Sequence, residues 1–303
     1  MFFGSPRPAA ICLAELVRSS HEVVGVITKV DRRRSRRGAV SKNPVAELAD
    51  RHLIPIFYDP SDALGLDFDL GVVVAYGKII PESVLKYRPL VNVHFSLLPR
   101  WRGAAPVERA ILAGDTQTGV TIMEVAPELD SGGIYAQRAL EIGPGETSLQ
   151  LTERMAQLGS ELLLESLPEI HAGSLRATPQ DGEVTWANKL TPDEMRVDWS
   201  KSPEYLLALV RVGRPWTTLG SKRILLKELH SVDGEIPKSP QDPPGTLGVA
   251  LHGGTKVVTV TTGAGQVVLD RVQPEGRGEM DGLSWFNGIT KTGGLCLGQD
   301  NIG

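Results

Sequence analysis

The chain has 303 residues, of which 41% are hydrophobic and 22% charged, and its formal net charge is −4 at pH 7. This composition is that of a globular protein and excludes a disordered or membrane chain, since no apolar run approaches the roughly 18 to 20 residues that a membrane-spanning helix needs. Cys12 and Cys296 lack the spacing of a disulfide framework or a zinc site, so we expect no metal. The first ten residues lack a signal-peptide pattern, so we expect a cytoplasmic protein.

The first half of the chain alternates apolar strand-like segments with helical ones. A short strand at residues 1–3 is followed by Ser5, a predicted N-cap, and Pro6 at the first helical position. Strands separated by helices are typical of βαβ units, which predicts an α/β fold with a doubly wound, mostly parallel, Rossmann-like sheet. The buried parallel strands that β-branched and apolar residues predict are residues 21–28, 69–77 and 90–96.

Positive charge is concentrated in one segment between two predicted elements. Residues 29–42 hold seven Lys and Arg against Asp31 alone, a local charge of +6 that leaves −10 for the rest of the chain. An acidic protein with one basic segment attracts a polyanion at that place and repels it elsewhere. A merely solvated run of charge would have the same sequence, so both interpretations stay open.

Two further strands and a long helix follow, and after them the predicted elements change from alternating strands and helices to short strands. Residues 118–125 and 133–142 predict two more strands, and a capping-box pattern predicts the start of a helix at Thr147. Beyond residue 205, short strands separated by Gly, Pro and Asp turns predict a small antiparallel barrel. The predicted division of the chain is a first domain at residues 1–184, a linker at 185–204 and a second domain at 205–303.

Asn92 and His94 are the first candidates for a site. They lie two residues apart on one strand, so their side chains share a face, and they lie where the strand ends, which is where open α/β sheets bind ligands. An amide donor stabilises a developing oxyanion, and an imidazole exchanges protons near neutrality. Asp130, in a turn beside two glycines, supplies a carboxylate that could orient the ring. Taken singly, each of these residues is more often a turn former or a structural residue than a catalytic one.

The three residues together with the sequence around them are more specific than any one of them. The stretch VNVHFSLLPRWRGAAP, followed by LDSGG, is similar to the active-site signature of the folate-dependent formyltransferases. Within them the chain resembles the methionyl-tRNA formyltransferases along nearly its whole length, in FFGSP, HEVVGVIT, VVVAYGKIIP, GVTIMEV, TWANKLTPDEMRVDWS and VQPEGRGEM. It departs from them in a shorter first strand, in Phe95 where a small residue is usual, and in RPWTTL, which lacks the second proline of Pro-Trp-Pro.

The resemblance implies an activity and its partners. It implies transfer of the formyl group of 10-formyltetrahydrofolate to the α-amino group of initiator methionyl-tRNA, giving the N-formylmethionyl-tRNA of translation initiation. It also implies a cytoplasmic enzyme of bacterial type, expected to act as a monomer without a metal or a membrane. The second domain is expected to resemble an oligonucleotide-binding fold that grips the acceptor arm.

The resemblance further implies roles for individual residues. The catalytic set is Asn92, His94 and Asp130. The implied folate-binding residues are Tyr76, Gly77, Ser96, Leu97, Leu98 and Pro99. The implied tRNA-binding residues are Arg32, Arg36, Arg37 and Lys42.

Two other classes of function remain to be separated from this one. A nucleotide-sugar formyltransferase or a hydrolase of formyl-folate would share the Asn, His and Asp, but the second domain and the arginine-rich segment suit RNA better. A nucleotide- or RNA-binding module without catalysis is the other class. Against it, the FFGSPRP turn lacks the glycine pattern G-x-G-x-x-G of dinucleotide sites.

Overall fold

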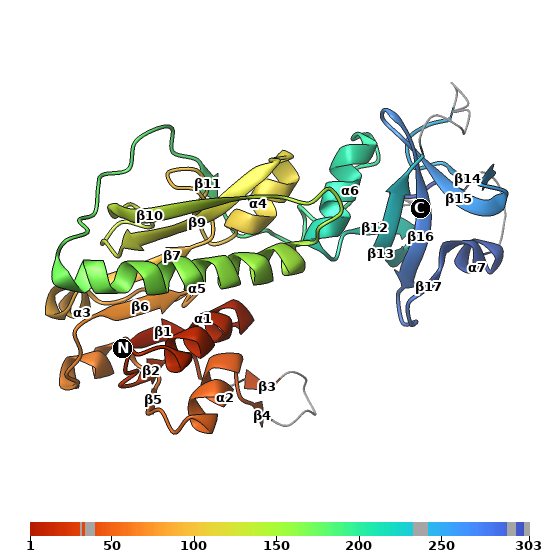
Figure 1. The fold of residues 1–303 in the computed structure, drawn as a ribbon. Helices are drawn as coiled ribbons and strands as arrows, with labels where there is room; N and C mark the ends of the chain where they lie inside the picture. Colours follow the sequence, from red (N-terminus) through yellow and green to blue (C-terminus); the bar gives the residue numbers. More distant parts are fainter. Residues whose placement is uncertain (31, 34–39, 233–241, 290–294, 300–303) are drawn as a thin grey trace. The chain divides into compact units, whose positions relative to one another are not determined.

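The computed structural model describes residues 1–30, 32–33, 40–232, 242–289 and 295–299 (Figure 1). The chain divides into two units. The first comprises Met1–Ala110, Asp115–Pro144 and Leu149–Lys189, and the second Ile111–Gly114, Gly145–Ser148 and Leu190–Gly303. The division after Lys189 falls inside the predicted linker, whose limits at 185 and 204 stay a prediction.

The first unit contains a seven-stranded sheet in the order β10-β9-β7-β6-β1-β2-β5. The five strands from β7 to β5 are parallel, β9 runs antiparallel to its neighbour β7, and β10 runs antiparallel to β9. The predicted mostly parallel, doubly wound sheet is therefore confirmed. The strand bounds are β1 Phe2–Gly4, β2 Val26–Ile27, β5 Ile56–Phe57, β6 Gly71–Val74, β7 Leu90–His94, β9 Gln117–Glu124 and β10 Ile134–Glu141.

The burial of each strand follows its place in the sheet. All four residues of β6 are buried, as expected for a central parallel strand covered on both faces. The edge strand β10 has no buried residue. Helices pack on the sheet, and the long helix α5 runs along it next to β9 and β7 (Figure 1). The helix bounds in this part of the chain are α1 Arg7–Arg18, α2 Pro44–Arg51, η1 Pro60–Gly65, α3 Glu82–Tyr87, α4 Pro106–Ala113 and α5 Ser148–Ala172.

The contact between α5 and the sheet depends on a glycine. A Cβ at Gly159 would lie 2.7 Å from Cγ1 of Val93 and 3.9 Å from a ring carbon of Phe95. Side chains alternate along a strand, so Val93 and Phe95 pack toward α5 while Asn92 and His94 face the other way. Phe95 therefore packs behind the strand, on the face opposite the candidate site.

Two local predictions were wrong. Residues 21–28 were expected to form one strand, but only Val26–Ile27 pair, with Phe2 and Phe3 of β1 on one side and Ile56 and Phe57 of β5 on the other. Ser5 does not cap α1, whose N-cap is Pro6. Instead the Ser5 hydroxyl accepts hydrogen bonds from Thr28 Oγ1 and from the backbone N–H of Lys29, each at 3.1 Å.

Two short pairs of strands extend the first unit. β3 (Arg32–Arg33) pairs with β4 (Val40–Ser41) within the basic segment. β8 (Arg102–Gly103) pairs in parallel with β11 (Trp186–Ala187), so the first residues of the predicted linker are hydrogen-bonded to the loop that follows β7.

The second unit is the expected antiparallel β domain. Its sheet has the order β12-β13-β16-β15-β14, with β17 also paired to β16. Trp199, Val260 and Trp285 lie in its core, and the indole Nε1–H of Trp199 donates to Thr217 Oγ1 at 3.0 Å. The bounds are α6 Pro203–Val212, β12 Trp216–Leu219, β13 Lys222–Ser231, β14 Leu247–His252, β15 Thr255–Thr262, β16 Gly265–Pro274, β17 Met280–Asp281 and α7 Gly282–Asn287.

Candidate active site

Strand β7 places Asn92 and His94 on one face at its carboxyl end. Asn92 is half-buried and His94 is 6% exposed. Within the part of the chain that the structure describes, the Asn92 carboxamide makes no hydrogen bond. A half-buried amide donor without an internal partner is available to a ligand, because buried polar groups otherwise find a partner within the protein.

The His94 ring has a hydrogen-bond partner on one side and a carboxylate on the other. Its Nε2 lies 2.9 Å from the backbone carbonyl oxygen of Trp101, and its Nδ1 lies 3.7 Å from Oδ2 of Asp130. A carbonyl oxygen only accepts, so Nε2 carries a hydrogen. The other ring nitrogen, Nδ1, faces the Asp130 carboxylate.

The loop after β7 is fixed so that the Trp101 carbonyl meets the ring. Trp101 has a φ of 64°, in the left-handed region that costs a non-glycine residue about 1 kcal/mol or more. Its backbone N–H donates to Thr185 Oγ1 at 2.8 Å, and its indole Nε1–H donates to Asp115 Oδ2 at 2.8 Å. Asp115 also binds the Arg100 guanidinium, which raises the pKa of Arg100, and that guanidinium lies 4.4 Å from the indole centroid.

The Asp130 carboxylate is positioned by two other segments. Its Oδ2 accepts the backbone N–H of Gly103 at 2.9 Å. The Gln180 amide nitrogen donates to the carbonyl oxygens of Asp130 and Gly132 at 2.8 and 2.9 Å. The Gln180 carbonyl in turn accepts two hydrogen bonds from the Arg102 guanidinium, so both ends of the Gln180 side chain tie the Asp130 turn to the loop after β7.

The predicted folate-binding stretch Ser96, Leu97, Leu98 and Pro99 forms a tight turn that begins two residues after His94. Ser96 is fully buried, and its hydroxyl donates to the Arg100 carbonyl at 2.6 Å. Thr121 Oγ1 donates to the Ser96 carbonyl at 2.7 Å and accepts the Leu98 N–H. Gln137 adds a hydrogen bond to the Leu98 carbonyl, at 2.9 Å. These contacts fix the turn from β9 and β10.

Tyr76 and Gly77, the other predicted folate-binding residues, follow strand β6, the parallel neighbour of β7. The Tyr76 side chain is 2% exposed and packs edge-on against Phe3, and burial raises the pKa of its phenol to about 12. Its side chain therefore belongs to the core, and only its backbone could face a ligand. Gly77 has a φ of 62°, which favours glycine at this turn.

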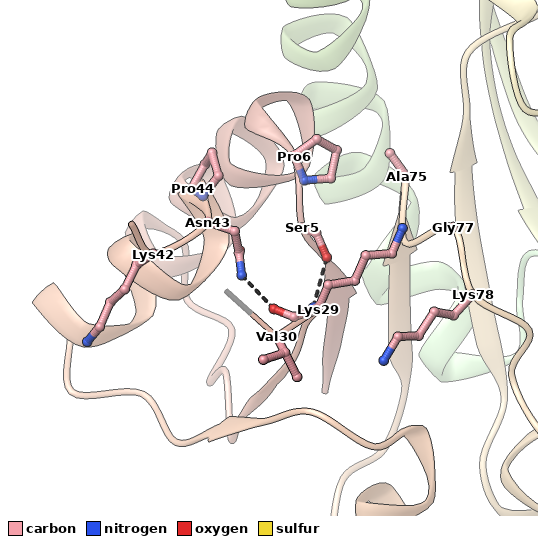
Figure 2. A pocket seen from close by; sticks show the side chains of 10 residues that line it. All are labelled: Ser5, Pro6, Lys29, Val30, Lys42, Asn43, Pro44, Ala75, Gly77 and Lys78. Carbon is pink, nitrogen blue, oxygen red and sulfur yellow. Dashed lines mark hydrogen bonds between the residues drawn. The ribbon is translucent and has the colours of Figure 1, made fainter. Parts of the chain in front are cut away.

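A pocket of about 770 Å³ opens beside Gly77 (Figure 2). Its walls come from the turn after β1, from the end of β2, from the start of α2 and from the turn after β6. The residues that line it are Ser5, Pro6, Lys29, Val30, Lys42, Asn43, Pro44, Ala75, Gly77 and Lys78.

The predicted tRNA-binding residues are only partly described. Lys42 is exposed, lines the pocket and forms an ion pair with Asp50. Arg32 lies in β3, where its backbone pairs with Ser41. Arg36 and Arg37 lie outside the described residues.

The described ranges contain neither a metal-binding cluster nor a membrane-spanning helix. Among those residues, no group of three or more His, Cys, Asp or Glu is arranged to hold a metal ion. None of the helices in the described ranges is long and apolar enough to cross a bilayer.

Sequence reasoning missed most of what holds the site together. Gln180 lies 50 residues from Asp130, and nothing in its surroundings, TPQDGE, marks it. The Trp101 carbonyl and the Gly103 N–H are backbone groups, which carry no side-chain signal. The glycine itself, in WRGAAP, was the one available sign of an unusual backbone conformation at this place.

The chain matches two family models, one for each unit. A model described as formyl transferase matches residues 1–167, and a model described as formyl transferase, C-terminal domain, matches residues 189–290. The methionyl-tRNA formyltransferase of Methylococcus capsulatus is 38% identical over 302 residues, covering 95% of this chain and 96% of that protein. The methionyl-tRNA formyltransferase of Symbiobacterium thermophilum is 37% identical, covering 98% and 93%.

Solved structures share the fold at lower sequence identity. The N-formyltransferase of Helicobacter canadensis, in complex with folinic acid and dTDP-3-aminofucose, has a TM-score of 0.65 at 15% identity, covering 88% of this chain and 97% of that one. A variant of HypX from Aquifex aeolicus has a TM-score of 0.64 at 19% identity. The match covers 96% of this chain and 48% of HypX, so the chain spans about half the length of that protein.

Proposed function

This chain belongs to the formyl transferase family, with methionyl-tRNA formyltransferases as relatives along nearly its whole length, and from that premise we propose that Asn92, His94 and Asp130 are its catalytic residues. The enzyme transfers the formyl group of 10-formyltetrahydrofolate to the α-amino group of methionyl-tRNA. The product, N-formylmethionyl-tRNA, serves translation initiation. The observation that carries the residue assignment is the pairing of an unbonded Asn92 amide with a His94 ring that is hydrogen-bonded to Trp101 and lies beside Asp130.

In the proposed mechanism, the methionyl α-amine attacks the formyl carbon. A carbon–nitrogen bond forms, and the formyl oxygen becomes an oxyanion, which the Asn92 amide stabilises by donating a hydrogen bond. The attacking nitrogen becomes positively charged and must lose a proton. As the bond from the formyl carbon to N10 of the folate breaks, that N10 gains a proton, and tetrahydrofolate leaves.

The two proton movements are assigned to His94. Because Nε2 donates to Trp101, Nδ1 takes the proton from the attacking amine and returns it to N10. The ring is positively charged between these two transfers, and the Asp130 carboxylate beside Nδ1 stabilises that charge. One imidazole thus serves both transfers without a net gain or loss of protons.

The remaining assignments concern the two substrates. The turn Ser96–Pro99 and the backbone of Tyr76 and Gly77 are proposed to line the folate site, because they flank the carboxyl ends of β7 and β6. The basic segment, with Arg32, Arg36, Arg37 and Lys42, is proposed to meet the acceptor end of the tRNA, because its charge suits phosphates. The antiparallel second unit is proposed to contact the acceptor arm.

The cellular setting and the assembly state are also proposals. A cytoplasmic location is inferred from the bacterial relatives and from the tRNA substrate, which is charged and used in that compartment. A monomer is inferred because all the proposed catalytic residues come from one chain. Light scattering of the purified protein tests this, and a mass of twice 32.7 kDa would contradict it.

One assay tests the function against its rivals. The protein is mixed with 10-formyltetrahydrofolate and charged initiator tRNA, and the aminoacyl ester is analysed. Formyl-methionine ester is the expected product. Formylation of an amino sugar nucleotide with no formyl-methionine, release of formate alone, or tRNA binding without product would each replace this function by one of the rival functions.

A further inference from the structure

The pocket beside Gly77 lies at the same sheet edge as the candidate catalytic residues. It is lined by residues that follow β1, β2 and β6 at their carboxyl ends. β6 is the parallel neighbour of β7, which carries Asn92 and His94, with Val74 opposite Val93. A ligand that fills the pocket and reaches along this edge therefore approaches the proposed site of formyl transfer.

The pocket is positively charged. Lys29, Lys42 and Lys78 line it, and none of its lining residues in the described part of the chain is acidic. The half-buried Lys29 side chain ends beside Ala75 and Gly77, where a Cβ at Gly77 would lie 2.8 Å from Lys29 Nζ (Figure 2). Lys78 donates to the Tyr58 carbonyl at 3.1 Å, which leaves its other N–H groups for a ligand. The Lys42 side chain points away from these two amines (Figure 2).

The backbone around the pocket adds to this charge. The N-terminus of α1 begins at the wall formed by Pro6, with no side-chain cap and no acidic residue in its first turn. The positive end of the helix dipole therefore faces the pocket without compensation. The contacts of Ser5 with Lys29 and of Asn43 with the Lys29 carbonyl, at 3.1 and 2.8 Å, hold the base of the Lys29 side chain in place (Figure 2). An anion is the ligand that this arrangement favours.

Both substrates carry anionic groups, and the sequence favours the tRNA over the folate as the ligand of this pocket. Lys29 and Lys42, the two ends of the basic segment, both line the pocket, and five arginines lie between them in the sequence. An RNA carries successive phosphates, which suits a pocket whose lysines are continuous in sequence with five arginines. The glutamate tail of a folate carries too few charges to use both the pocket and this segment.

We propose that Lys29 and Lys78 form a phosphate-binding site for a nucleotide near the 3′ end of methionyl-tRNA. The phosphate held there fixes the distance from the RNA backbone to the edge of the sheet, so that the aminoacyl group lies at Asn92 and His94. This inference rests on the proposed function. It goes beyond it by assigning substrate positioning to two lysines that lie outside the proposed catalytic residues.

The test is steady-state kinetics of the full-length enzyme with each substrate varied in turn. The variants are Lys29→Gln, Lys78→Gln and the double variant, with Lys29→Arg as a charge-retaining variant. Lys86→Gln is the matched control, because Lys86 is an exposed lysine of α3 outside the pocket. Circular dichroism melts establish that all variants are folded.

The expected result is a loss that is specific to the tRNA. Each Gln variant should lower kcat/KM for methionyl-tRNA about tenfold, as for a lost hydrogen bond to a charged group, with the KM for 10-formyltetrahydrofolate unchanged. The slope of log kcat/KM against log salt should become less steep by about 0.7 to 0.9 for a lost phosphate contact. Lys29→Arg keeps the charge, so it should retain the wild-type salt slope and lose less kcat/KM than Lys29→Gln, whereas Lys86→Gln should behave like the wild-type enzyme.

Three outcomes would overturn the inference while the proposed function stands. The first is that the Lys29→Gln and Lys78→Gln variants have unchanged kinetics for methionyl-tRNA. The second is that these variants increase only the KM for the formyl-folate, which would assign the site to the folate tail. The third is that the Lys86→Gln control loses as much activity as they do. If the wild-type enzyme forms no formyl-methionine ester, the proposed function fails instead, and the two failures are thereby distinguished.

Discussion

Asn92 and His94 differ in the contacts that their side chains make within the protein, and this difference indicates different roles. The imidazole makes its contacts within the protein, at 2.9 Å to the Trp101 carbonyl and 3.7 Å to the Asp130 carboxylate. The Asn92 amide makes no hydrogen bond within the described ranges. A ring fixed by the protein suits proton transfer, whereas an unbonded amide suits contact with a substrate oxygen. The two side chains thus supply complementary parts of one formyl transfer.

Replacing Asn92 by alanine tests the oxyanion assignment. The variant should retain its affinity for methionyl-tRNA while kcat falls by about 10² to 10³, the usual cost of losing one oxyanion donor. Single-turnover formylation and a separate tRNA-binding measurement give the two quantities. Asn188→Ala, a change of the same kind at an exposed position, is the control. Near-full turnover in Asn92→Ala would contradict the assignment.

At the scale of single residues, sequence predicted the candidate side chains but not what holds them. The two-residue spacing of Asn92 and His94 was sufficient to place them on one face, because side-chain alternation along a strand is a fixed property of the backbone. The contacts of Asp130 with Gly103 and Gln180 join segments far apart in the sequence, and they depend on loop conformations. Whether these residues act as assigned stays a prediction, which the variants test.

Among the elements, the short pair β8 and β11 connects the site to a distant segment. Gly103 has a φ of 124°, and a Cβ there would lie 2.7 Å from the Ala187 carbonyl oxygen. The same residue donates its N–H to Asp130. A side chain at this position would therefore push β8 from β11 and move a donor away from the proposed catalytic carboxylate.

We expect Gly103→Ala to lose most of its activity. Gly114→Ala is the matched control, because Gly114 also has a positive φ, of 74°, but has no atom within 4 Å of the added Cβ. Both variants should lose about 1 to 2 kcal/mol of stability from backbone strain, measured by denaturant unfolding, and only Gly103→Ala should lose kcat. Equal activity in the two variants would show that the β8 contact does not position Asp130.

Helices and strands were predicted well where the pattern of their own residues determines them. They were predicted less well where a neighbouring strand determines how far they extend or which hydrogen bonds they make. The buried strand β6 and the long helix α5 have strong patterns of their own. The segment 21–28 is as apolar as a central strand, but only two residues pair, because a strand extends only as far as its neighbours allow. The Ser5 hydroxyl likewise bonds across to β2, a choice that a local N-cap pattern does not reveal.

For the whole molecule, charge is the property that sequence alone determines best. A net charge of −4 combined with +6 in residues 29–42 makes the rest of the chain repel a polyanion. Productive tRNA binding is therefore expected to depend on this segment and to weaken as salt increases, since binding to phosphates releases counterions.

Replacing Arg36 and Arg37 together by alanine tests this expectation from the sequence. The double variant should lose affinity for methionyl-tRNA, with the affinity for the formyl-folate retained, and its salt dependence should flatten by about 0.7 to 0.9 in log–log slope per lost contact. Arg18→Ala with Arg176→Ala, two exposed arginines elsewhere, gives a control with the same change of net charge. An unchanged slope would mean that the segment is merely solvated.

The central claim is that one amide and one imidazole at the end of β7 surround the carbon that is transferred. A crystal structure of the enzyme with a formyl-bearing folate analogue measures this directly. The account predicts that the formyl oxygen lies about 2.7 to 3.1 Å from the Asn92 amide nitrogen, with the His94 ring beside the formyl group. A folate whose formyl group lies beyond contact of both side chains would contradict it.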